Sequence, residues 1–515
     1  MEARGRLRGF SAIAPVRAKW LALAAIFAMC VGVTFISYQP YLFEWDDADY
    51  FARSILVSEA FWHWNPDALV NGMVSIRPPV MTWMGLPWGA LASWNAAGNC
   101  FITLASAVAV LAAACLYLLL RIGVKPYFLV AASVCVAASL GPFPPGTTVH
   151  HFATGFVADS LFAWTALVAV LLIPYEARTP SHSIRSGALR GILWGAALSW
   201  GTMTKLSFLY FAVLVLPALL SIRIRRDGTR TTVAACVTFS CCSAPSVLYL
   251  LRWGRPAFDN AKASSFGRAA EFSYIPILQF LGDSVRESPS LLLSFLLTIA
   301  ALIYLVLKRR LRQSWPDWLP LLIMVGFGIM VLAAPNRQIR YAFPVILALP
   351  YLVAILISGE TQSTSRSSAT VAAGLAFCGL FLASVPTQHR PNWQSIVRSE
   401  AVLDAASRRN ASRILLATDS PTLNGFLMDL AREFSDARVS ACGTLAYQAM
   451  SGAPIEQDYL GMSQVDMVVF QDPRALSPPY TNQRVPEYER YAQRAGFGPV
   501  RIGDDISVYL MRHGR

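Results

Sequence analysis

Long apolar stretches recur along the chain, and they restrict the fold more than any other feature of the sequence. Roughly 20 apolar residues in a helix cross the hydrocarbon core of a bilayer. Only 14% of the 515 residues are charged and 55% are hydrophobic, whereas soluble domains carry about 25% charged residues. The composition therefore predicts a polytopic α-helical membrane protein. Eleven candidate spans lie near 20–37, 97–120, 126–141, 155–174, 190–204, 206–222, 232–250, 289–307, 318–334, 341–358 and 370–386.

One apolar stretch, residues 190–222, is too long for a single span and is divided by Lys205. Arginines flank the stretch at both ends, which favours a hairpin whose two ends lie on the same side of the membrane. We therefore expect two helices with Lys205 at the turn between them.

The distribution of Lys and Arg predicts the orientation of the chain, because cytoplasmic loops are enriched in these residues. With a cytoplasmic N-terminus, the inner segments hold nineteen Lys and Arg, and the longer outer segments before Pro386 hold ten. The basic N-terminus and the stretch 20–37 read as a retained anchor, since no small-residue cleavage site follows. We predict a multi-pass protein of the plasma (inner) membrane, in which the first loop and everything after Pro386 are extracytoplasmic.

The segment after Pro386 has a different composition and predicts a second domain. RILLATD and VDMVVFQD resemble buried strands that end in acids, PTLNGFLMDLAREF resembles an amphipathic helix, and ISVYLMR is a further strand candidate. We expect a transmembrane domain over 1–386 and a small α/β domain over 387–515. From Pro386 onward fourteen basic residues balance fourteen acidic ones, so the formal charge of +13 belongs to the membrane part. This balance argues against a nucleic-acid partner.

The first outer loop begins with a cluster of acids in the sequence FEWDDADYFAR, residues 43–53. Neighbouring acids repel one another and raise one another's pKa, so a cluster at a membrane interface needs a reason. Asp46 and Asp47 are the candidate catalytic acids, and Glu44 and Asp49 are expected to be their solvated companions. The alternative is that all four are exposed acids in the first turn of a surface helix. Tryptophans later in this loop predict short helices along the membrane surface or simple anchors.

Further ionisable residues fall on the outer side of the predicted topology, and an ionisable residue inside a span is a candidate functional residue. They are Asp159, His150, His151, Lys205 and Arg340. Each has an ordinary alternative: a helix cap for Asp159, loop hydrogen bonds for the histidines, snorkelling for Lys205 and a topology signal for Arg340. Their convergence on the side of the acid cluster is what favours a functional site.

The order of these residues resembles the GT-C superfamily of membrane glycosyltransferases. The closest branches are the protein O-mannosyltransferases of glycosyltransferase family 39 and the transferases that add aminoarabinose to lipid A. The resemblance rests on short motifs over about residues 20–386: the pair Asp46-Asp47, Arg77-Pro78-Pro79, Asp159 at the head of a span, Thr204-Lys205 after the glycine-spaced GILWGAALSWGTMTK, and Arg340-Tyr341 before Pro344.

The resemblance implies transfer of a sugar from a polyprenyl-phosphate donor to a cell-envelope lipid, glycan or protein on the outer face of the membrane. It implies that an acid of the first outer loop activates the acceptor. The chemistry agrees, because the acceptor hydroxyl needs a base and the departing phosphate needs cations. Arg77, Lys205 and Arg340 are the candidate phosphate ligands, with Asp159, His150 and His151 as substrate or supporting residues. A single base predicts inversion at the anomeric carbon.

Other functions remain open at this point. A flippase or transporter of lipid-linked sugars would show internal repeats and charges at mid-bilayer, neither of which is evident. A glycan ligase or polymerase would use a long basic outer loop, and residues 251–287 fit that description. A divalent metal can be held by Asp46, Asp47, Asp159, His150 and His151 if their loops meet. The C-terminal domain either binds the acceptor or caps the outer loops.

Overall fold

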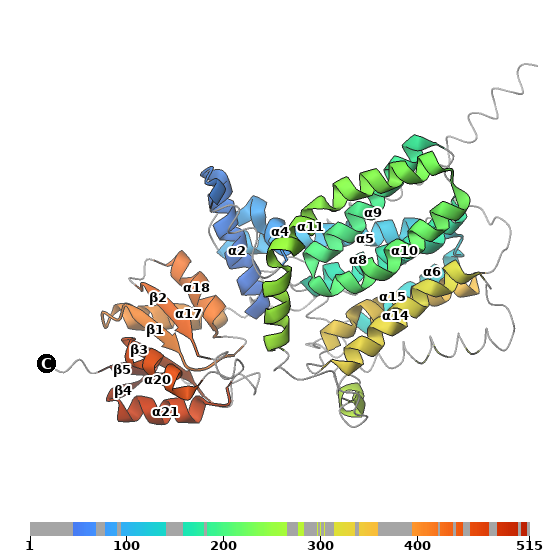
Figure 1. Ribbon diagram of the computed structural model, residues 1–515. Coiled ribbons are helices and arrows are strands. Elements are labelled where there is room, and N and C mark those ends of the chain that lie inside the picture. Colours follow the sequence, from blue (N-terminus) through green and yellow to red (C-terminus); the bar gives the residue numbers. More distant parts are fainter. Residues whose placement is uncertain are drawn as a thin grey trace, which may run out of the picture.

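The computed structural model describes the chain in segments that together form a helical bundle and a sheet domain (Figure 1). The sheet domain, orange to red in Figure 1, lies at one end of the bundle. The described residues are 45–67, 78–89, 94–140, 158–179, 183–264, 277–282, 296, 299, 303, 314–334, 339–358, 394–420, 423–435, 439–445, 454–472, 482–502 and 506–511.

The bundle is built around α8 (Ala158–Arg178), which is buried along nearly its whole length. Its central residues are apolar on all sides, as in a helix at the centre of a bundle, and five helices of the described residues pack against it. The helices of the bundle are α5 (Trp94–Ile122), α6 (Pro126–Leu140), α8, α9 (Ile184–Thr204), α10 (Leu209–Arg226), α11 (Thr229–Ser264), α14 (Trp315–Ala333) and α15 (Ile339–Ile357).

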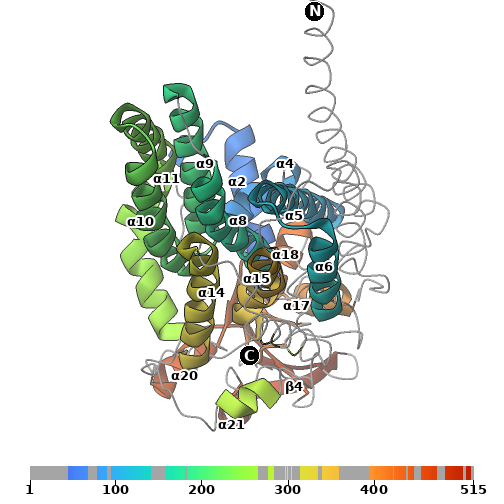
Figure 2. The same ribbon diagram turned by 90° about the vertical axis from the view of Figure 1, so that its right-hand side faces the viewer.

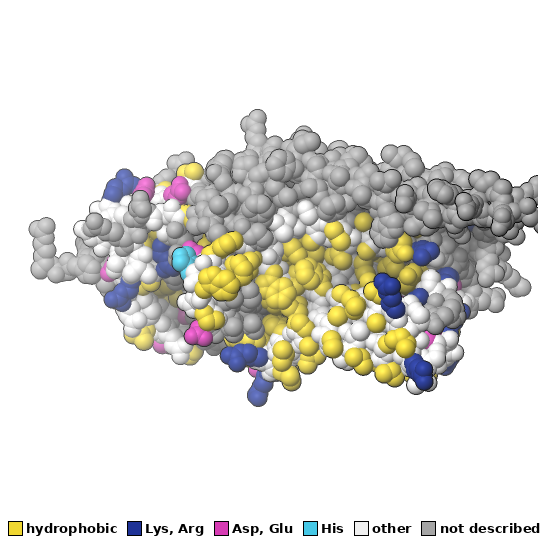
Figure 3. Space-filling view, turned by 90° about the horizontal axis from the view of Figure 1, so that it is seen from above, with side chains coloured by type: hydrophobic (Ala, Val, Ile, Leu, Met, Phe, Trp, Pro, Cys, Tyr) yellow, Lys and Arg dark blue, Asp and Glu magenta, His cyan; other side chains and the backbone are white. Residues whose placement is uncertain are grey.

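Five helices within the described residues are long and apolar enough to cross a membrane, and all five overlap predicted spans. Figure 3 shows a broad band of apolar side chains on one face, bordered by Lys and Arg. Helices α5, α6 and α9 occupy three more predicted spans. The stretches 20–37 and 370–386, and nearly all of 289–307, lie outside the described residues. The chain is a multi-pass membrane protein, and the total of eleven spans stays a prediction.

The predicted division at Lys205 is confirmed. Helix α9 ends at Thr204, a single 3-10 turn follows from Leu206 to Phe208, and α10 runs back from Leu209. The backbone N–H of Lys205 donates to the carbonyl oxygen of Gly201 at 3.0 Å, which closes the last turn of α9.

Helices α9 and α11 approach each other through glycines spaced four residues apart. A Cβ atom at Gly187 would overlap the carbonyl oxygen of Thr231, and one at Gly191 would overlap that of Ala235. Gly195 faces the Cβ atom of Cys242 in the same way. Small residues at this spacing let two membrane helices pack backbone against backbone, so the glycine stripe of the sequence is a packing surface.

Substituting Gly191 with alanine is expected to lower the melting temperature of the detergent-solubilised protein, because the added methyl group forces α9 and α11 apart. Gly254→Ala in α11 is the matched control, since its nearest neighbours are atoms of Leu250 at 3.8 Å. Alanine is favoured over glycine in a helix by about 1 kcal/mol, so the control should melt at or above the wild-type temperature. Equal melting of the two variants would contradict the proposed packing.

The C-terminal segment forms a five-stranded sheet in the order β2-β1-β3-β5-β4. Strand β1 (Arg413–Leu416) is parallel to β2 (Ala441–Thr444) and β3 (Met467–Gln471), whereas β5 (Ile506–Met511) is antiparallel to β3 and β4 (Phe497–Ile502). The strands predicted in RILLATD, VDMVVFQD and ISVYLMR are β1, β3 and β5. The domain boundary predicted at 386 lies outside the described residues.

Helices cover both faces of this sheet, as the period-two alternation of its strands requires. Ile414, Met467 and Val508 pack on the side of α17 (Gln394–Ser407) and α18 (Gly425–Phe434). Leu415 and Val468 face the other way, toward α20 (Ile455–Ser463) and α21 (Val485–Arg494). The amphipathic helix predicted in PTLNGFLMDLAREF is α18.

The sheet domain contains one cysteine, Cys442, which is partly buried against the core on the side of α17 and α18. Burial, together with the nearby Asp429 carboxylate and against the opposing effect of Arg432, raises the pKa of the Cys442 thiol to about 12. Such a thiol is protonated at neutral pH and is therefore a poor nucleophile.

The loop predicted to be the first outer one contains two short helices that pack against each other, α2 (Trp45–Trp62) and α4 (Val80–Gly89). Two serine hydroxyls of α2 donate to backbone carbonyls of α4: Ser54 to Thr82 at 3.0 Å and Ser58 to Leu86 at 2.8 Å. The short helices predicted in this loop are therefore present. Trp62, the last residue of α2, and Trp64 are exposed, and the location of these helices along the membrane surface stays a prediction.

Candidate functional site

Lys205 and Asp159 form an ion pair at one end of the bundle. The Nζ atom of Lys205 lies 2.5 Å from Oδ1 of Asp159, and their side chains are 23% and 5% exposed. Asp159 is in the first turn of α8, and Lys205 is at the turn between α9 and α10. A buried carboxylate needs such a partner, because an unpaired charge would pay its full desolvation cost. The Lys205 side chain as a whole stays partly exposed.

Aromatic rings surround the same ammonium group. The Nζ atom of Lys205 lies 4.9 Å from the ring centre of Tyr341 and 5.6 Å from that of Phe162. Arg340 contacts Tyr341 too, with its Cζ atom 5.1 Å from the ring centre and its Nη2 donating to the phenol oxygen at 3.2 Å. Both cations thus lie within about 5 Å of one ring centre, which puts them no more than about 10 Å apart.

A cluster of phenylalanine rings supports this site from within the bundle. Phe162 of α8 contacts Phe208 at 6.2 Å, Phe211 at 6.0 Å and Phe327 at 5.9 Å between ring centres. These rings come from four elements, and edge-on or tilted contacts of this kind stabilise a packed arrangement beyond the area they bury. Phe162, which also contacts the Lys205 ammonium, connects the ion pair to this packed aromatic cluster.

The acid-bearing helix α2 lies at the same end of the bundle. Its residues Tyr50 and Phe51 belong to one buried cluster with Ala158 and Leu161, which flank Asp159, and with Met203, two residues before Lys205. Asp46 and Asp47 are in the first turn of α2, one turn before Tyr50. The fold therefore brings the predicted acid helix next to the Lys205–Asp159 pair.

One expectation for this helix is wrong. Asp49 is not solvated but is 5% exposed, and its carboxylate accepts from Nε of Arg53 at 3.0 Å. The reason is the packing of α2, which buries the face that carries Asp49 together with Tyr50 and Phe51. Arg53 is one turn further along α2, so the ion pair compensates the buried charge of Asp49 within this helix.

The side chains of several predicted site residues are not among those that the structure describes. Arg77, His150, His151 and Glu44 lie outside the described residues, and the side chains of Asp46 and Asp47 do as well. Among the described residues, no three His, Cys, Asp or Glu side chains are placed to hold a metal ion. The side chains of His150, His151, Asp46 and Asp47, which belong to the hypothetical divalent site, are not described, so the metal site stays a hypothesis. The structure thus brings together Asp159, Lys205 and Arg340.

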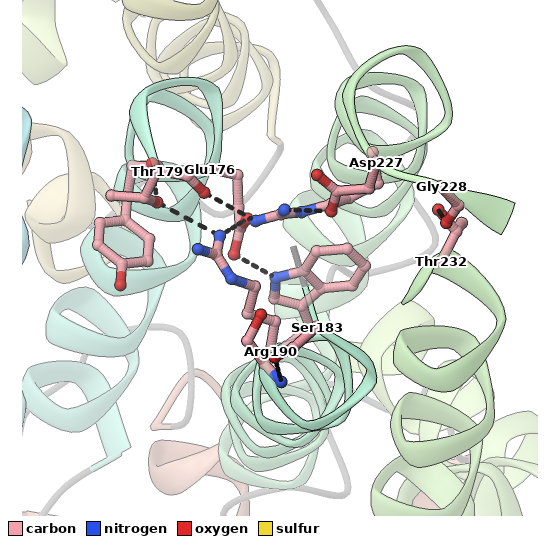
Figure 4. A network of polar contacts seen from close by, with 11 residues as sticks. Glu176, Thr179, Ser183, Arg190, Asp227, Gly228 and Thr232 are labelled. Atoms are coloured by element: carbon pink, nitrogen blue, oxygen red, sulfur yellow. Dashed lines mark hydrogen bonds and ion pairs between the residues drawn. The ribbon is translucent and has the colours of Figure 1, made fainter. Parts of the chain in front are cut away.

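A second buried charge cluster lies at the opposite end of α8, and it was not predicted. Glu176 is fully buried and accepts from Arg190, from Arg223 and, at 3.1 Å, from Nε1 of Trp194. Arg223 also pairs with Asp227. Figure 4 shows the side chains of Glu176 and Arg190 pointing toward each other from different helices.

This cluster links the helices α8, α9 and α10 at the end of the bundle away from Lys205. Nearby, Arg178 of α8 pairs with Asp317 of α14. Every charge in the cluster has an opposite charge beside it, which is the arrangement of a structural clamp. The sequence signal was an acid at the end of the apolar sequence LLIPYEAR, but Arg178, two residues later, made this acid resemble the polar end of a span.

Comparisons with known proteins support the fold. No family model matches the chain, and no curated protein matches it in sequence. Among solved structures, the chain is similar to ArnT from Cupriavidus metallidurans bound to undecaprenyl phosphate, with a TM-score of 0.54 and 12% identity, over 96% of this chain and 98% of that one. The apo state of the same protein gives a TM-score of 0.49 at 12% identity over 99% and 98% of the two chains.

The first of these similarities extends over almost the whole of both chains, so it concerns the complete architecture and not one helical segment. The chain therefore shares its overall fold with this solved structure, as the sequence motifs led us to expect. At 12% identity the likeness concerns the fold, and the activity has to be argued from the site.

Proposed function

We propose that this protein transfers a sugar from a polyprenyl-phosphate donor to a cell-envelope acceptor. The observation that carries the proposal is the convergence of Lys205, Asp159 and Arg340, from three separate parts of the bundle, beside the acid-bearing helix α2. Support also comes from the fold, which is similar to that of an ArnT bound to undecaprenyl phosphate.

The two cations serve the phosphate of the donor. An ammonium and a guanidinium near one another stabilise the negative charge that develops on phosphate as the glycosidic bond breaks. Arginine can grip two phosphate oxygens at once, and lysine supplies a point charge. Asp159 keeps the Lys205 ammonium in place while no phosphate is bound, and the remaining N–H groups of that ammonium are then available to the donor. Arg77 is proposed as a third cation.

The acid pair serves the acceptor. Asp46 acts as the general base that takes the proton of the acceptor hydroxyl, and Asp47 orients its neighbour or the donor. The hydroxyl oxygen forms a bond to the anomeric carbon, the bond from that carbon to the phosphate oxygen breaks, and polyprenyl phosphate leaves. A single displacement of this kind inverts the anomeric configuration. The reaction takes place on the extracytoplasmic face of the plasma membrane, where the Lys and Arg distribution puts the acids.

Replacing Lys205 or Arg340 with methionine is expected to weaken the binding of undecaprenyl phosphate by at least ~10-fold each, the scale of one lost charge-assisted hydrogen bond. Native mass spectrometry of the detergent-solubilised protein, titrated with undecaprenyl phosphate, measures this affinity directly. Methionine keeps most of the apolar stem of either side chain and removes the charged group together with its contact to the Tyr341 ring.

Arg255→Met is the matched control, because the Arg255 side chain is 93% exposed and pairs only loosely with Asp259 at 3.9 Å. Its affinity for undecaprenyl phosphate should equal that of the wild type. If Lys205→Met and Arg340→Met both bind the lipid as tightly as this control, the assignment of the phosphate site is wrong.

A further inference from the structure

Helix α18 of the sheet domain has two apolar faces that belong to different cores. Met428 and Ala431 point into the core of the sheet domain and are 0% and 1% exposed. Leu427 and Leu430 are both fully buried as well, but they pack in the cluster that contains Tyr50 and Phe51 of α2. The helix therefore joins the sheet domain to the acid-bearing helix.

Helix α2 is held from two sides as a result. Helix α4 binds it through the hydroxyls of Ser54 and Ser58, and α18 packs against it through Leu427, Leu430 and the ring of Phe434. The ring centres of Phe51 and Phe434 lie 6.1 Å apart. Figures 1 and 2 both show α18 beside α2.

The cluster under α18 also contains the neighbours of the ion pair. Ala158 and Leu161 flank Asp159 in sequence, and Met203 precedes Lys205 by two residues. One continuous set of packed side chains thus connects α18, the acid helix and the Lys205–Asp159 pair. Packed cores transmit displacements because they leave few voids, so a shift of α18 moves α2 relative to the pair.

We propose that Leu427, Leu430 and Phe434 are positioning residues for the transfer reaction. They hold the first turn of α2, with Asp46 and Asp47, at its working distance from Lys205. The inference rests on the proposed function, in which Asp46 is the base and Lys205 binds phosphate. A base displaced by about 1 Å can lose on the order of 100-fold in rate while ligand binding is retained. The sheet domain is thus coupled to catalysis through packing.

Two large-to-small substitutions in the same helix test this role. Leu430→Ala opens a gap on the α2 side, and Met428→Ala opens one on the sheet side. We expect Leu430→Ala to lower turnover by at least ~10-fold with unchanged affinity for undecaprenyl phosphate, because the base is displaced and the cations are not. Met428→Ala should lower the melting temperature without changing turnover per folded molecule. Leu430→Met, which nearly conserves volume, should restore turnover.

Turnover is measured with polyprenyl-phosphate-linked lipids and envelope acceptors extracted from the host cell. Wild-type turnover in Leu430→Ala, or an equal loss in both alanine variants, would overturn the positioning role. A wild-type protein that binds undecaprenyl phosphate but turns over no extracted donor would overturn the proposed function instead. In that case the positioning role is tested without activity, from the melting temperatures of Phe51→Ala, Phe434→Ala and the double variant. Non-additive shifts in melting temperature show that α18 holds α2, and additive shifts show that it does not.

Discussion

Asp46→Asn is expected to keep the protein folded and able to bind undecaprenyl phosphate but to lower sugar transfer by at least ~10²-fold, the scale of a lost general base. An amide has nearly the shape of the carboxylate and cannot take the acceptor proton. Asp47→Asn should cost less, because this residue orients its neighbour or the donor. The measurement is turnover by purified, detergent-solubilised variants, with a melting curve for each.

Glu59→Gln is the matched control for these variants, because Glu59 is an exposed acid of the same helix. It should transfer sugar at the wild-type rate. Asp49→Asn cannot serve this purpose, since Asp49 is buried and paired with Arg53. Near-normal turnover in Asp46→Asn would refute its role as base, and near-normal turnover in the double amide at 46 and 47 would refute the functional reading of the acid pair.

Glu176→Ala is expected to destabilise the bundle strongly. It removes the carboxylate shared by Arg190 and Arg223, and Arg223 is only 2% exposed. Breaking a buried ion pair by deleting one partner typically costs about 3–5 kcal/mol, because a buried charge is left uncompensated. The loss should appear as a marked fall in melting temperature or as failure to recover folded protein from the membrane.

Asp259→Ala is the control for that experiment. Asp259 pairs with Arg255 at 3.9 Å, and the two side chains are 65% and 93% exposed, so its removal should not shift the melting curve measurably. Lys205 and Asp159 lie at the other end of α8, so any folded Glu176→Ala protein should still bind undecaprenyl phosphate. If Glu176→Ala melts like the Asp259→Ala control, the cluster is not a structural clamp.

The sequence alone identified the charged residues that stand out from the apolar residues on either side of them. Lys205 interrupts an apolar stretch, and Asp159 lies at the start of another. Because a charge inside a membrane span has a high desolvation cost, such residues are candidate functional residues from the sequence alone. The hairpin at Lys205 and the strands of the sheet domain were equally readable, because span length and alternating hydrophobicity are properties of short segments.

Contacts between residues far apart in the chain could not be predicted from the sequence of either segment. Asp49 resembled a solvated acid because nothing in FEWDDADYFAR shows that α2 is packed by α4 and α18. Glu176 resembled the polar end of a span because Arg178 follows it, and its partners Arg190 and Arg223 come from two other helices. The aromatic surroundings of Lys205 depend in the same way on Tyr341, which lies more than a hundred residues away in sequence.

The central claim is that the protein consumes a polyprenyl-phosphate sugar, and reconstitution tests it most directly. The purified protein is incorporated into vesicles with the polyprenyl-phosphate lipids and the envelope acceptor fraction of cells that lack its gene, and all products are followed by mass spectrometry. The account predicts loss of one lipid-linked sugar, equimolar release of free polyprenyl phosphate and a matching mass increase on an acceptor, none of which occurs with Asp46→Asn. A donor that reaches the opposite leaflet with its sugar still attached would contradict the account and indicate a transporter.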